Sequence, residues 1–428
     1  MRDVACTYAQ AIREIYLLDR FGSRLGLEMI RAILNEMGDP QKKYKCVLVG
    51  GSNGKGSTTE MIGAILQESG ARVGTYFSPQ IERFEERFRV NGKDATRREI
   101  ADAYGKVRAA AGRCAPDATF FEVVTAMTLF IFAKRKADFA VLEVGLGGRL
   151  DATNAVSPDV SVLTSLSLEH IDVLGNTIEK IAHEKCGIAR RGKPLVCGAV
   201  SGRAGLAVGK ECAHAGARAV FVEDEIEVSD LREDGGRYSF EAVHSGNGYS
   251  VRLSAPGKFQ VSNAMCALAA CALLGAGKKA IERGLAHASP KFRLQLLGGA
   301  PAVIADCAHN PEAARALAIE VRAMRAGKKV LLFSAMKDKD YSAVLAALVP
   351  IFDDIFITEV KLERGEKTAL LAKAAVAAGA KGVHAEKAAS DALRSAKKVA
   401  GKKGLVVVAG SIYLLAEIYG KDKIRLAQ

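Results

Sequence analysis

The sequence predicts an α/β protein of two domains, each built on a sheet whose strands are mostly parallel. The chain has 428 residues, which is more than one ordinary hydrophobic core accommodates. Short apolar runs alternate with longer helical patterns in both halves, which is typical of doubly wound parallel sheets. Residues 220–256 alternate polar and apolar positions between glycine turns, which indicates a few small antiparallel strands.

The elements of the first domain follow from the period of the apolar residues. A buried strand at 45–50 precedes an amphipathic helix at 56–68 that ends at Gly70. The polar stretch 80–96 has no stable period and is predicted to be a loop with a hairpin-like turn at 89–92. Further strands are predicted at residues 71–79, 137–145, 159–166 and 193–200. Further helices are predicted at residues 9–37, with a glycine-marked break, at 97–112 and at 120–136.

The second domain begins after a small-residue helix predicted at 262–275. We place the linker at 288–293 and divide the chain into domains 1–288 and 289–428. The second part has about the length that one Rossmann-like unit needs. Its strands are predicted at residues 301–308, 329–336, 354–360, 382–386 and 404–411.

The composition excludes several classes of protein. No stretch approaches about 18 uncharged apolar residues, so we expect no membrane span. The first residues carry acids and no long apolar run, so we expect no secretory signal and a cytoplasmic location. The nine cysteines are scattered and form no C-x-x-C pair, which argues against a zinc site or a disulfide framework. The net charge of +13 comes without a basic arm, so we expect an anionic small substrate rather than nucleic acid.

The segment 47–60, VLVGGSNGKGSTTE, is the first candidate site. A strand that ends in glycines and enters a helix offers unpaired N–H groups and a positive helix end to a phosphate. Lys55 would lie over the outer phosphates, and Ser57 can donate to phosphate oxygens. The usual phosphate loop has a glycine where Val49 stands and no residue such as Gly56 between the lysine and the hydroxyl. The alternative is a tight glycine turn with a surface lysine.

Three further residues of the first domain are candidates. Glu143 lies near the carboxyl end of an apolar strand, where ligands of open α/β sheets gather and where a carboxylate is costly unless it meets a cation. Mg²⁺ bound to ATP is such a cation, and an ion pair with Arg149 is the alternative. His170 follows the next strand at the same edge. Lys185 lies on a partly apolar helix stripe, so it is either a snorkelling surface lysine or a lysine turned into the nucleotide site.

The second domain has polar residues between a predicted strand and helix. Asp306 ends the strand and could hold a ribose hydroxyl, and His309 follows it. Asn310 is expected to cap the helix, and Pro311 suits the first turn of that helix.

At these residues the chain resembles the folylpolyglutamate synthase/dihydrofolate synthase family, a branch of the Mur ligase superfamily. The string VLEVGLGGRLDATN at 141–154 is a highly specific match, and the family's phosphate loop also lacks the outer glycine and keeps the glycine after the lysine. The other matching stretches run in family order across nearly the whole chain: 51–58, 77–92, 120–127, 163–188, 291–297, 306–311 and 407–417.

The resemblance implies an N-terminal P-loop-type Mur ligase ATPase domain and a C-terminal Rossmann-like glutamate ligase domain. It implies that ATP phosphorylates a carboxylate of a folate or dihydropteroate, and that L-glutamate then attacks the acyl phosphate, with release of ADP and phosphate. Phosphoryl transfer spreads negative charge, so Lys55, backbone amides and one or two Mg²⁺ ions would stabilise it. We expect a monomer with no nucleic-acid or membrane partner.

The resemblance also assigns roles to individual residues. The catalytic residues would be Lys55, Glu143, His170 and Lys185, with Lys185 carbamylated to N6-carboxylysine. The Mg²⁺ ligands would be Ser78, Glu143 and His170. The ATP contacts would be Asn53, Gly54, Lys55, Gly56, Ser57, Thr58, Asn263, Arg293, Asp306 and His309. The pterin end of the acceptor would lie near Leu25, Gly26, Leu27, Glu28, Thr119, Phe120, Phe121, Leu150, Asp151 and Ala152, and a ring can stack on Phe121.

The chain departs from the family pattern at a few positions. Gln80 stands where the family commonly has histidine, Lys291 and Phe292 stand for Pro-Gly, and Cys307 stands for glycine. None of these changes removes a proposed catalytic residue, but they leave open a less usual pterin acceptor. The alternatives are a Mur-type ligase that acts on another pterin or on a cell-wall precursor, and a nucleotide-binding protein that has lost ligase activity.

Overall fold

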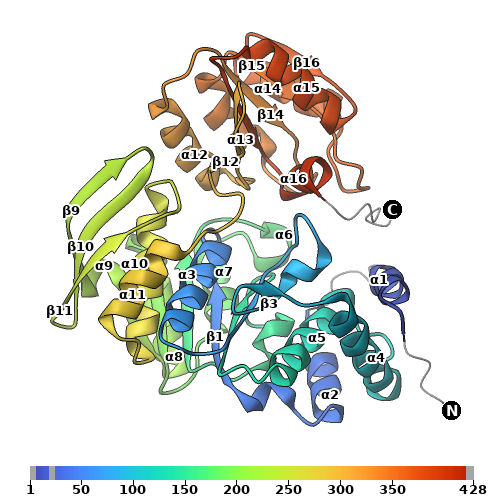
Figure 1. Cartoon of the computed structure of the whole chain (residues 1–428), viewed down its shortest axis with the longest axis vertical. Coiled ribbons are helices and arrows are strands. Elements are labelled where there is room, and N and C mark those ends of the chain that lie inside the picture. The colour runs from blue at the N-terminus through green and yellow to red at the C-terminus, as the bar shows by residue number, and fades with distance from the viewer. Residues whose placement is uncertain (1–5, 19–24, 421–428) are drawn as a thin grey trace.

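The computed structural model describes residues 6–18 and 25–420 and divides them into two α/β domains (Figure 1). The first domain (blue to yellow) lies below the second (orange to red), which sits over the carboxyl end of β1, Lys45–Gly50. The predicted α/β class is confirmed. Within the described residues, no helix combines the length and the apolar character that crossing a membrane requires.

The first domain is built on an eight-stranded sheet in the order β4-β3-β2-β5-β1-β6-β7-β8. The strands β2, β5, β1, β6, β7 and β8 pair in parallel. Strands β3 and β4 add antiparallel pairs at the edge beside β2. The hairpin predicted at 89–92 is present, and its turn residues Asn91 and Gly92 have φ of 49° and 69°. The remaining strands are β2 Val73–Tyr76, β3 Phe88–Val90, β4 Lys93–Asp94, β5 Phe139–Glu143, β6 Val160–Ser165, β7 Pro194–Ala199 and β8 Arg218–Phe221.

Helices cover both faces of this sheet. Helices α1 (Tyr8–Leu17), α2 (Glu28–Glu36), α4 (Arg97–Cys114) and α5 (Phe120–Lys134) pack against one buried apolar cluster. Helices α3 (Lys55–Glu68), α10 (Phe259–Leu273) and α11 (Lys278–His287) pack against another. Capping boxes begin α1, α4 and α5, where a threonine and the third helical residue satisfy each other's backbone N–H groups. The sequence did not predict α11 or α8 (Gly202–Ala215).

The predicted strand 71–79 is too long. Strand β2 ends at Tyr76, and residues 77–79 leave the sheet. The N–H of Ser78 donates to the side chain of Glu143 (3.0 Å) instead of to a neighbouring strand, and Pro79 has no N–H to give. This departure brings the loop after β2 to the carboxyl end of β5.

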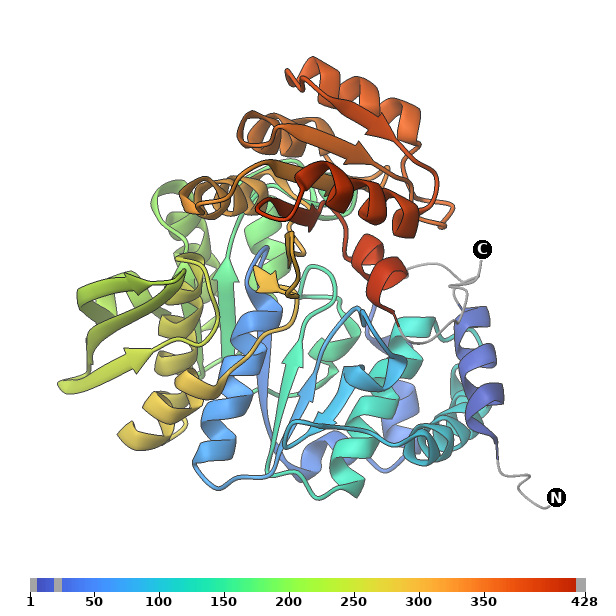
Figure 2. The same cartoon turned by 45° about the horizontal axis from the view of Figure 1, so that its top comes forward.

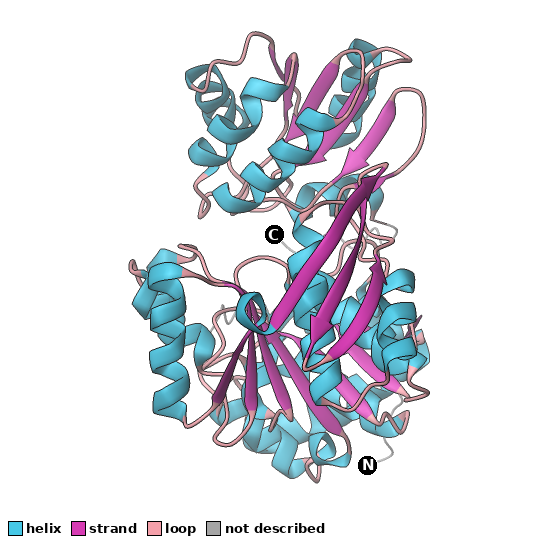
Figure 3. Ribbon diagram, turned by 90° about the vertical axis from the view of Figure 1, so that its left-hand side faces the viewer, coloured by secondary structure: helices cyan, strands magenta, loops and turns pink. Residues whose placement is uncertain are grey.

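The antiparallel strands predicted within 220–256 form a separate three-stranded sheet. It consists of β9 Ile226–Asp234, β10 Arg237–His244 and β11 Asn247–Arg252, in the order β11-β10-β9. This ribbon projects from the side of the first domain in Figure 1 and faces the viewer in Figure 3. Its inner residues, such as Phe240 and Val251, join the apolar cluster of α10 and α11.

The second domain has a six-stranded sheet in the order β12-β13-β17-β14-β15-β16. Only β12 is antiparallel to its neighbour. Its strands are β12 Gln295–Leu296, β13 Ala302–Ala305, β14 Lys329–Phe333, β15 Asp354–Ile357, β16 Val383–Ala385 and β17 Leu405–Ala409. Helices α12 (Pro311–Ala323), α13 (Tyr341–Leu348) and α14 (Thr368–Ala377) pack on one face, and α15 (Ala389–Ala400) and α16 (Ile412–Tyr419) pack on the other.

The boundary that the sequence predicts at 288/289 falls between α11 and β12. Phe292 in this connection has a φ of 52°, in the left-handed region, yet its side chain is buried in the second domain and lies 5.9 Å from the ring of Tyr419. Lys291 points the other way and pairs with Glu82 of the first domain (2.6 Å). The connection (gold in Figure 2) is therefore held by both domains.

Candidate active site

A cavity of about 2440 Å³ opens between the two domains, at the carboxyl ends of both parallel sheets. Most of the predicted site residues line it. They are Leu25, Gly26, Asn53, Gly54, Lys55, Gly56, Ser57, Ser78, Thr119, Phe120, Phe121, Glu143, Leu150, Asp151, Ala152, His170, Asn263, Arg293, Asp306 and His309. The predicted residues that do not reach its wall are Leu27, Glu28, Thr58 and Lys185.

The glycines between β1 and α3 let the backbone turn tightly toward this cavity. Gly54 has a φ of 87°, and a β-carbon there would come within 2.2 Å of the side-chain oxygen of Asn263. Lys55 begins α3, and its Nζ donates to the carbonyl oxygens of Gly51 (2.8 Å) and Ser52 (3.2 Å). The hydroxyls of Ser57 and Thr58 are buried and accept or donate no hydrogen bond within the described residues. Unpaired buried hydroxyls at a helix N-terminus suit an anionic ligand or its cation.

Gly56 explains the unusual order Lys-Gly-Ser. A β-carbon at Gly56 would lie 3.4 Å from Oε1 of Glu143 and 3.6 Å from a terminal nitrogen of Arg293. A side chain would therefore fill the space between the phosphate loop, the carboxylate and the guanidinium. The glycine keeps this space open.

Glu143 ends β5 with 7% of its surface exposed. Burial raises the pKa of its carboxyl, and the positive charge of Lys55 opposes that rise. Arg149 is paired with Glu184 (2.8 Å), so the alternative ion pair with Arg149 is not formed. A carboxylate held this way beside a phosphate loop fits a bound cation.

His170 lies directly before the short helix α6, Ile171–Leu174, in a left-handed conformation with a φ of 48°. Its Nε2 lies 3.0 Å from Nζ of Lys339, which comes from the second domain. Burial and the charge of Lys339 lower the pKa of His170 to about 4. The imidazole is therefore neutral at pH 7, which is the form that binds a metal.

Lys185 lies in α7, Ile178–Cys186, and only 2% of it is exposed, which rules out a surface lysine. Its Nζ donates to Oε1 of Glu169 (2.7 Å) and to the carbonyl oxygen of Gly51 (3.1 Å). Burial lowers the pKa of Lys185. In Glu169, the charges of Lys185 and Lys55 outweigh the effect of burial and hold the pKa well below its usual range. Glu169 was not among the residues predicted from the sequence, although it stands next to His170 beyond the end of β6.

The second domain contributes groups that are well satisfied. The two carboxylate oxygens of Asp306 accept from the N–H groups of Leu294 and Ala308, both at 2.8 Å. Asn310 caps α12 by accepting from the N–H of Ala313 (2.9 Å), as the sequence predicts. Its Nδ2 donates to the side chain of Asn53 in the phosphate loop (2.8 Å), which joins the two domains across the cavity.

The three predicted metal ligands all lie at the cavity. Ser78 and Glu143 are in hydrogen-bond contact, and both line the cavity with His170. Within the described residues, no three side chains of His, Cys, Asp or Glu come together as a metal cluster. The carboxylate of Glu143, the neutral imidazole of His170 and the hydroxyl of Ser78 are nevertheless suitable donors for a Mg²⁺ ion that takes its other ligands from phosphate and water, and the unpaired hydroxyl of Ser57 lines the same cavity.

Comparison with known proteins identifies the family. The Mur ligase middle domain matches residues 49–271, and the Mur ligase glutamate ligase domain matches residues 292–412. The chain belongs to the Mur ligase family. The Bacillus subtilis protein named dihydrofolate synthase/folylpolyglutamate synthase is 31% identical over 93% of this chain and 95% of its own length, so the chain belongs to that branch.

A longer Mur ligase relative also matches. The Haloferax volcanii protein named probable bifunctional folylpolyglutamate synthase/dihydropteroate synthase is 36% identical over 96% of this chain but only 50% of its own length. The chain therefore spans about half the length of this relative, and of a second haloarchaeal relative with the same name.

Two solved Mur ligase structures share the whole fold. Escherichia coli FolC in complex with DHPP and ADP has a TM-score of 0.87 at 29% identity, over 96% of this chain and 97% of that one. The Yersinia pestis folylpolyglutamate synthase/dihydrofolate synthase with AMPPNP and a Mn ion has a TM-score of 0.85 at 31% identity, over 98% of both chains.

The wall opposite the phosphate loop is aromatic and apolar in this Mur ligase. Phe120 and Phe121 begin α5 there, and Tyr16 of α1 lies 5.7 Å from the ring of Phe120. Leu27 lies behind this wall in the apolar core, and Glu28 begins α2. Gln80, Arg87 and Lys339 also line the cavity. None of the three was predicted as a site residue, although Gln80 was noted as a departure from the family pattern.

Proposed function

We propose that this chain is an ATP-dependent ligase that adds L-glutamate to the carboxylate of a folate or of dihydropteroate. The observation that carries the proposal is the shared cavity. One wall has a phosphate loop with the unpaired hydroxyl of Ser57 beside Glu143, and the other has an aromatic surface that suits a flat ring. The named relatives and the complexes with ADP, AMPPNP and DHPP support the same reaction.

In the proposed reaction, an oxygen of the acceptor carboxylate attacks the γ-phosphorus of ATP, which forms an acyl phosphate and releases ADP. The amino group of glutamate then attacks the acyl carbon, phosphate leaves, and the amine loses a proton. Lys55 and the N–H groups at the start of α3 would stabilise the transferred phosphoryl group. Arg293, Asp306, His309 and Asn263 would orient the nucleotide from the second domain and from α10.

A divalent cation is part of the proposal, with Mg²⁺ as the expected ion. Ser78, Glu143 and His170 would hold it, and it would neutralise charge on the phosphates of ATP. The AMPPNP complex of the Yersinia relative with a Mn ion supports a divalent metal at such a site.

We also propose that Lys185 is carbamylated. Its neutral amine would bind CO₂ and release a proton, and burial favours that neutral form. The carbamate would place a negative charge beside Glu169, so this modification requires a cation between the two groups. A monomer in the cytoplasm remains our expectation for the assembly and its location.

The test is glutamate- and ATP-dependent phosphate release, with the product identified by mass. The acceptors are dihydropteroate, tetrahydrofolate, methylene-tetrahydrofolate and a muramyl-peptide precursor. A one-glutamate mass gain on dihydropteroate identifies a dihydrofolate synthase, and a gain on the folates identifies a folylpolyglutamate synthase. A gain on the muramyl-peptide precursor alone, or on no acceptor, contradicts the proposal.

A further inference from the structure

The loop Ser78–Arg87 connects the phosphate side of the cavity to its aromatic wall, and one side chain ties the loop together. The Nε2 of Gln80 donates to the phenol oxygen of Tyr16 (2.7 Å). The Oε1 of Gln80 accepts from Nε of Arg87. Because the arginine can only donate, this pair of bonds fixes which end of the amide faces which partner.

Arg87 is a buried cation whose charge acts on the carboxyl of Glu143 but forms no close ion pair within the described residues. Only 5% of the residue is exposed, and its guanidinium lies 5.3 Å from the ring centre of Phe120 and 5.8 Å from that of Phe84. Within residues 6–18 and 25–420, no carboxylate forms an ion pair with it. A buried guanidinium without an anionic partner is costly, and rings on its flanks offset only part of that cost. A ligand oxygen on a flat ring or on its side chain would complete the site.

We propose that Gln80 is a positioning residue that sets acceptor specificity by holding Arg87 against the aromatic wall. The amide accepts from the Nε–H of Arg87, so the terminal N–H groups of the guanidinium are left to the nearby hydroxyl of Tyr76 and to an oxygen of the acceptor. The same amide anchors the loop to α1 through Tyr16. This inference rests on the proposed function, because it names the residue that orients the acceptor in that reaction.

The chemistry of a glutamine distinguishes this role from simple packing. A carboxylate at position 80 would also accept from Arg87, but it would neutralise the guanidinium and could not donate to Tyr16. A leucine would remove both bonds. A neutral histidine offers one acceptor and one donor nitrogen about as far apart as the two ends of an amide, and histidine is the residue that the family commonly has here.

The experiment compares Gln80→Leu, Gln80→Glu and Gln80→His with the wild-type protein. A lost charge-assisted hydrogen bond predicts a KM for the acceptor that is about 10-fold to 100-fold higher in the Leu and Glu variants. The KM for ATP should stay within about twofold of wild type, and the His variant should recover most of the acceptor affinity. Gln67→Leu, at an exposed position of α3, is the matched control and should behave as wild type.

Equilibrium binding of dihydropteroate, followed by fluorescence without ATP, separates this inference from the proposed function. Wild type that binds the acceptor with the predicted losses in the variants supports the role of Gln80, even if no glutamate is transferred. An absence of glutamate transfer then counts against the proposed reaction alone. Unchanged acceptor binding in the Leu and Glu variants, a parallel rise in the KM for ATP, or no binding by wild type overturns the inference.

Discussion

The carboxyl ends of the two parallel sheets face the same cavity but differ in how far their polar side chains are hydrogen-bonded within the protein. At the first sheet, the hydroxyls of Ser57 and Thr58 are buried without partners, and Glu143 is buried at the end of an apolar strand. At the second sheet, both oxygens of Asp306 accept backbone N–H groups, and Asn310 caps a helix. The difference indicates that the first edge keeps polar groups unpaired for a ligand, whereas Asp306 and Asn310 at the second edge are already fixed by backbone N–H groups.

This contrast has an energetic side. A buried polar group without a partner costs about 1–3 kcal/mol, so the first edge carries a penalty that a bound ligand would relieve. At the second edge, Asp306 and Asn310 carry little such penalty, although the buried hydroxyl of Ser334, directly after β14, has no partner within the described residues. Changes at the first edge should therefore affect activity more than stability, and loss of the helix cap at Asn310 should do the reverse.

The largest expected effect is at Glu143. Glu143→Gln should lower the rate of Mg²⁺-dependent ADP formation about 10³-fold, because it removes the negative charge that the proposed metal needs. ADP release measured over a range of Mg²⁺ concentrations checks this. Full retained activity contradicts the assignment of Glu143 as a ligand.

The same variant should be more stable than wild type at neutral pH when metal and nucleotide are absent. Burial raises the pKa of Glu143 in the folded protein above its ordinary value of 4.5, so the unfolded chain releases this proton first. The contribution of Glu143 to stability is therefore present at low pH and declines as the pH rises through the folded pKa. The difference in melting temperature between Glu143→Gln and wild type should increase as the pH rises from 4 to 8. A difference that stays constant contradicts the raised pKa of Glu143.

Lys185 comes next in the expected size of its effect. Lys185→Ala should lower turnover about 100-fold while far-ultraviolet circular dichroism stays unchanged. It should also lower the melting temperature, because Glu169 then keeps a buried charge without its partner. Added acetate or another small acid should restore part of the turnover if a carbamate acts there. Near-normal turnover in the variant contradicts a catalytic role for Lys185.

Gly56→Ala should change stability and ATP binding in opposite directions at the first edge. Alanine favours helix α3 over glycine by about 1 kcal/mol, so stability should rise. The new methyl group enters the space beside Glu143 and Arg293, so the KM for ATP should rise about tenfold. Thermal melting tests the expected rise in stability, and titration of the same preparation with ATP tests the expected rise in KM. Gly105→Ala in helix α4, where a β-carbon meets nothing within 4 Å, is the control.

The smallest effects are expected at the second edge. Asn310→Ala removes the cap of α12 and should cost about 1 kcal/mol of unfolding free energy. Asn310→Asp keeps the cap oxygen and loses the donor to Asn53, so it should retain stability and lose a few-fold in turnover. Urea unfolding and steady-state kinetics distinguish the two variants. A large loss of turnover in Asn310→Asp would mean that the hydrogen bond from Asn310 to Asn53 is needed for the reaction itself.

The sequence predicted the parts of this protein that depend on local pattern. Apolar runs located β1, β5 and β6, and the glycines after β1 marked the turn at Gly54 because only that residue type fits beside Asn263. Helices such as α8 escaped prediction, because its alanines and glycines give a weak apolar period.

The parts of the site that depend on tertiary contact were not predictable in the same way. Glu169 meets Lys185 from a residue 16 positions away, and Lys339 meets His170 from a residue 169 positions away. No local pattern encodes such pairs. The sequence could place Glu143 and His170 at one edge, because strands of a parallel sheet end together, but not the partners that fix their protonation.

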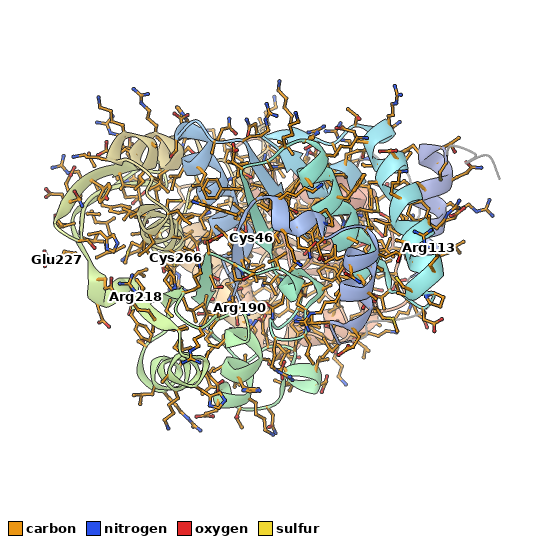
Figure 4. The ribbon with its side chains drawn as sticks, turned by 90° about the horizontal axis from the view of Figure 1, so that it is seen from below. Cys46, Arg113, Arg190, Arg218, Glu227 and Cys266 are labelled. Atoms are coloured by element: carbon orange, nitrogen blue, oxygen red, sulfur yellow. The ribbon has the colours of Figure 1, made fainter. Side chains whose placement is uncertain are left out.

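The burial of the thiols has a practical consequence for measuring how the two domains move. Seven of the nine cysteines are buried, and burial raises the pKa of Cys46 and Cys266 to about 12 (Figure 4). Such thiols react slowly with maleimide dyes, because the thiolate is the reactive form. A cysteine introduced at Ser245, in the exposed turn between β10 and β11, would therefore outcompete the buried native ones for a fluorophore. With a second dye on the exposed face of α15, energy transfer between the two dyes would show whether the separation of the two domains changes when ATP binds.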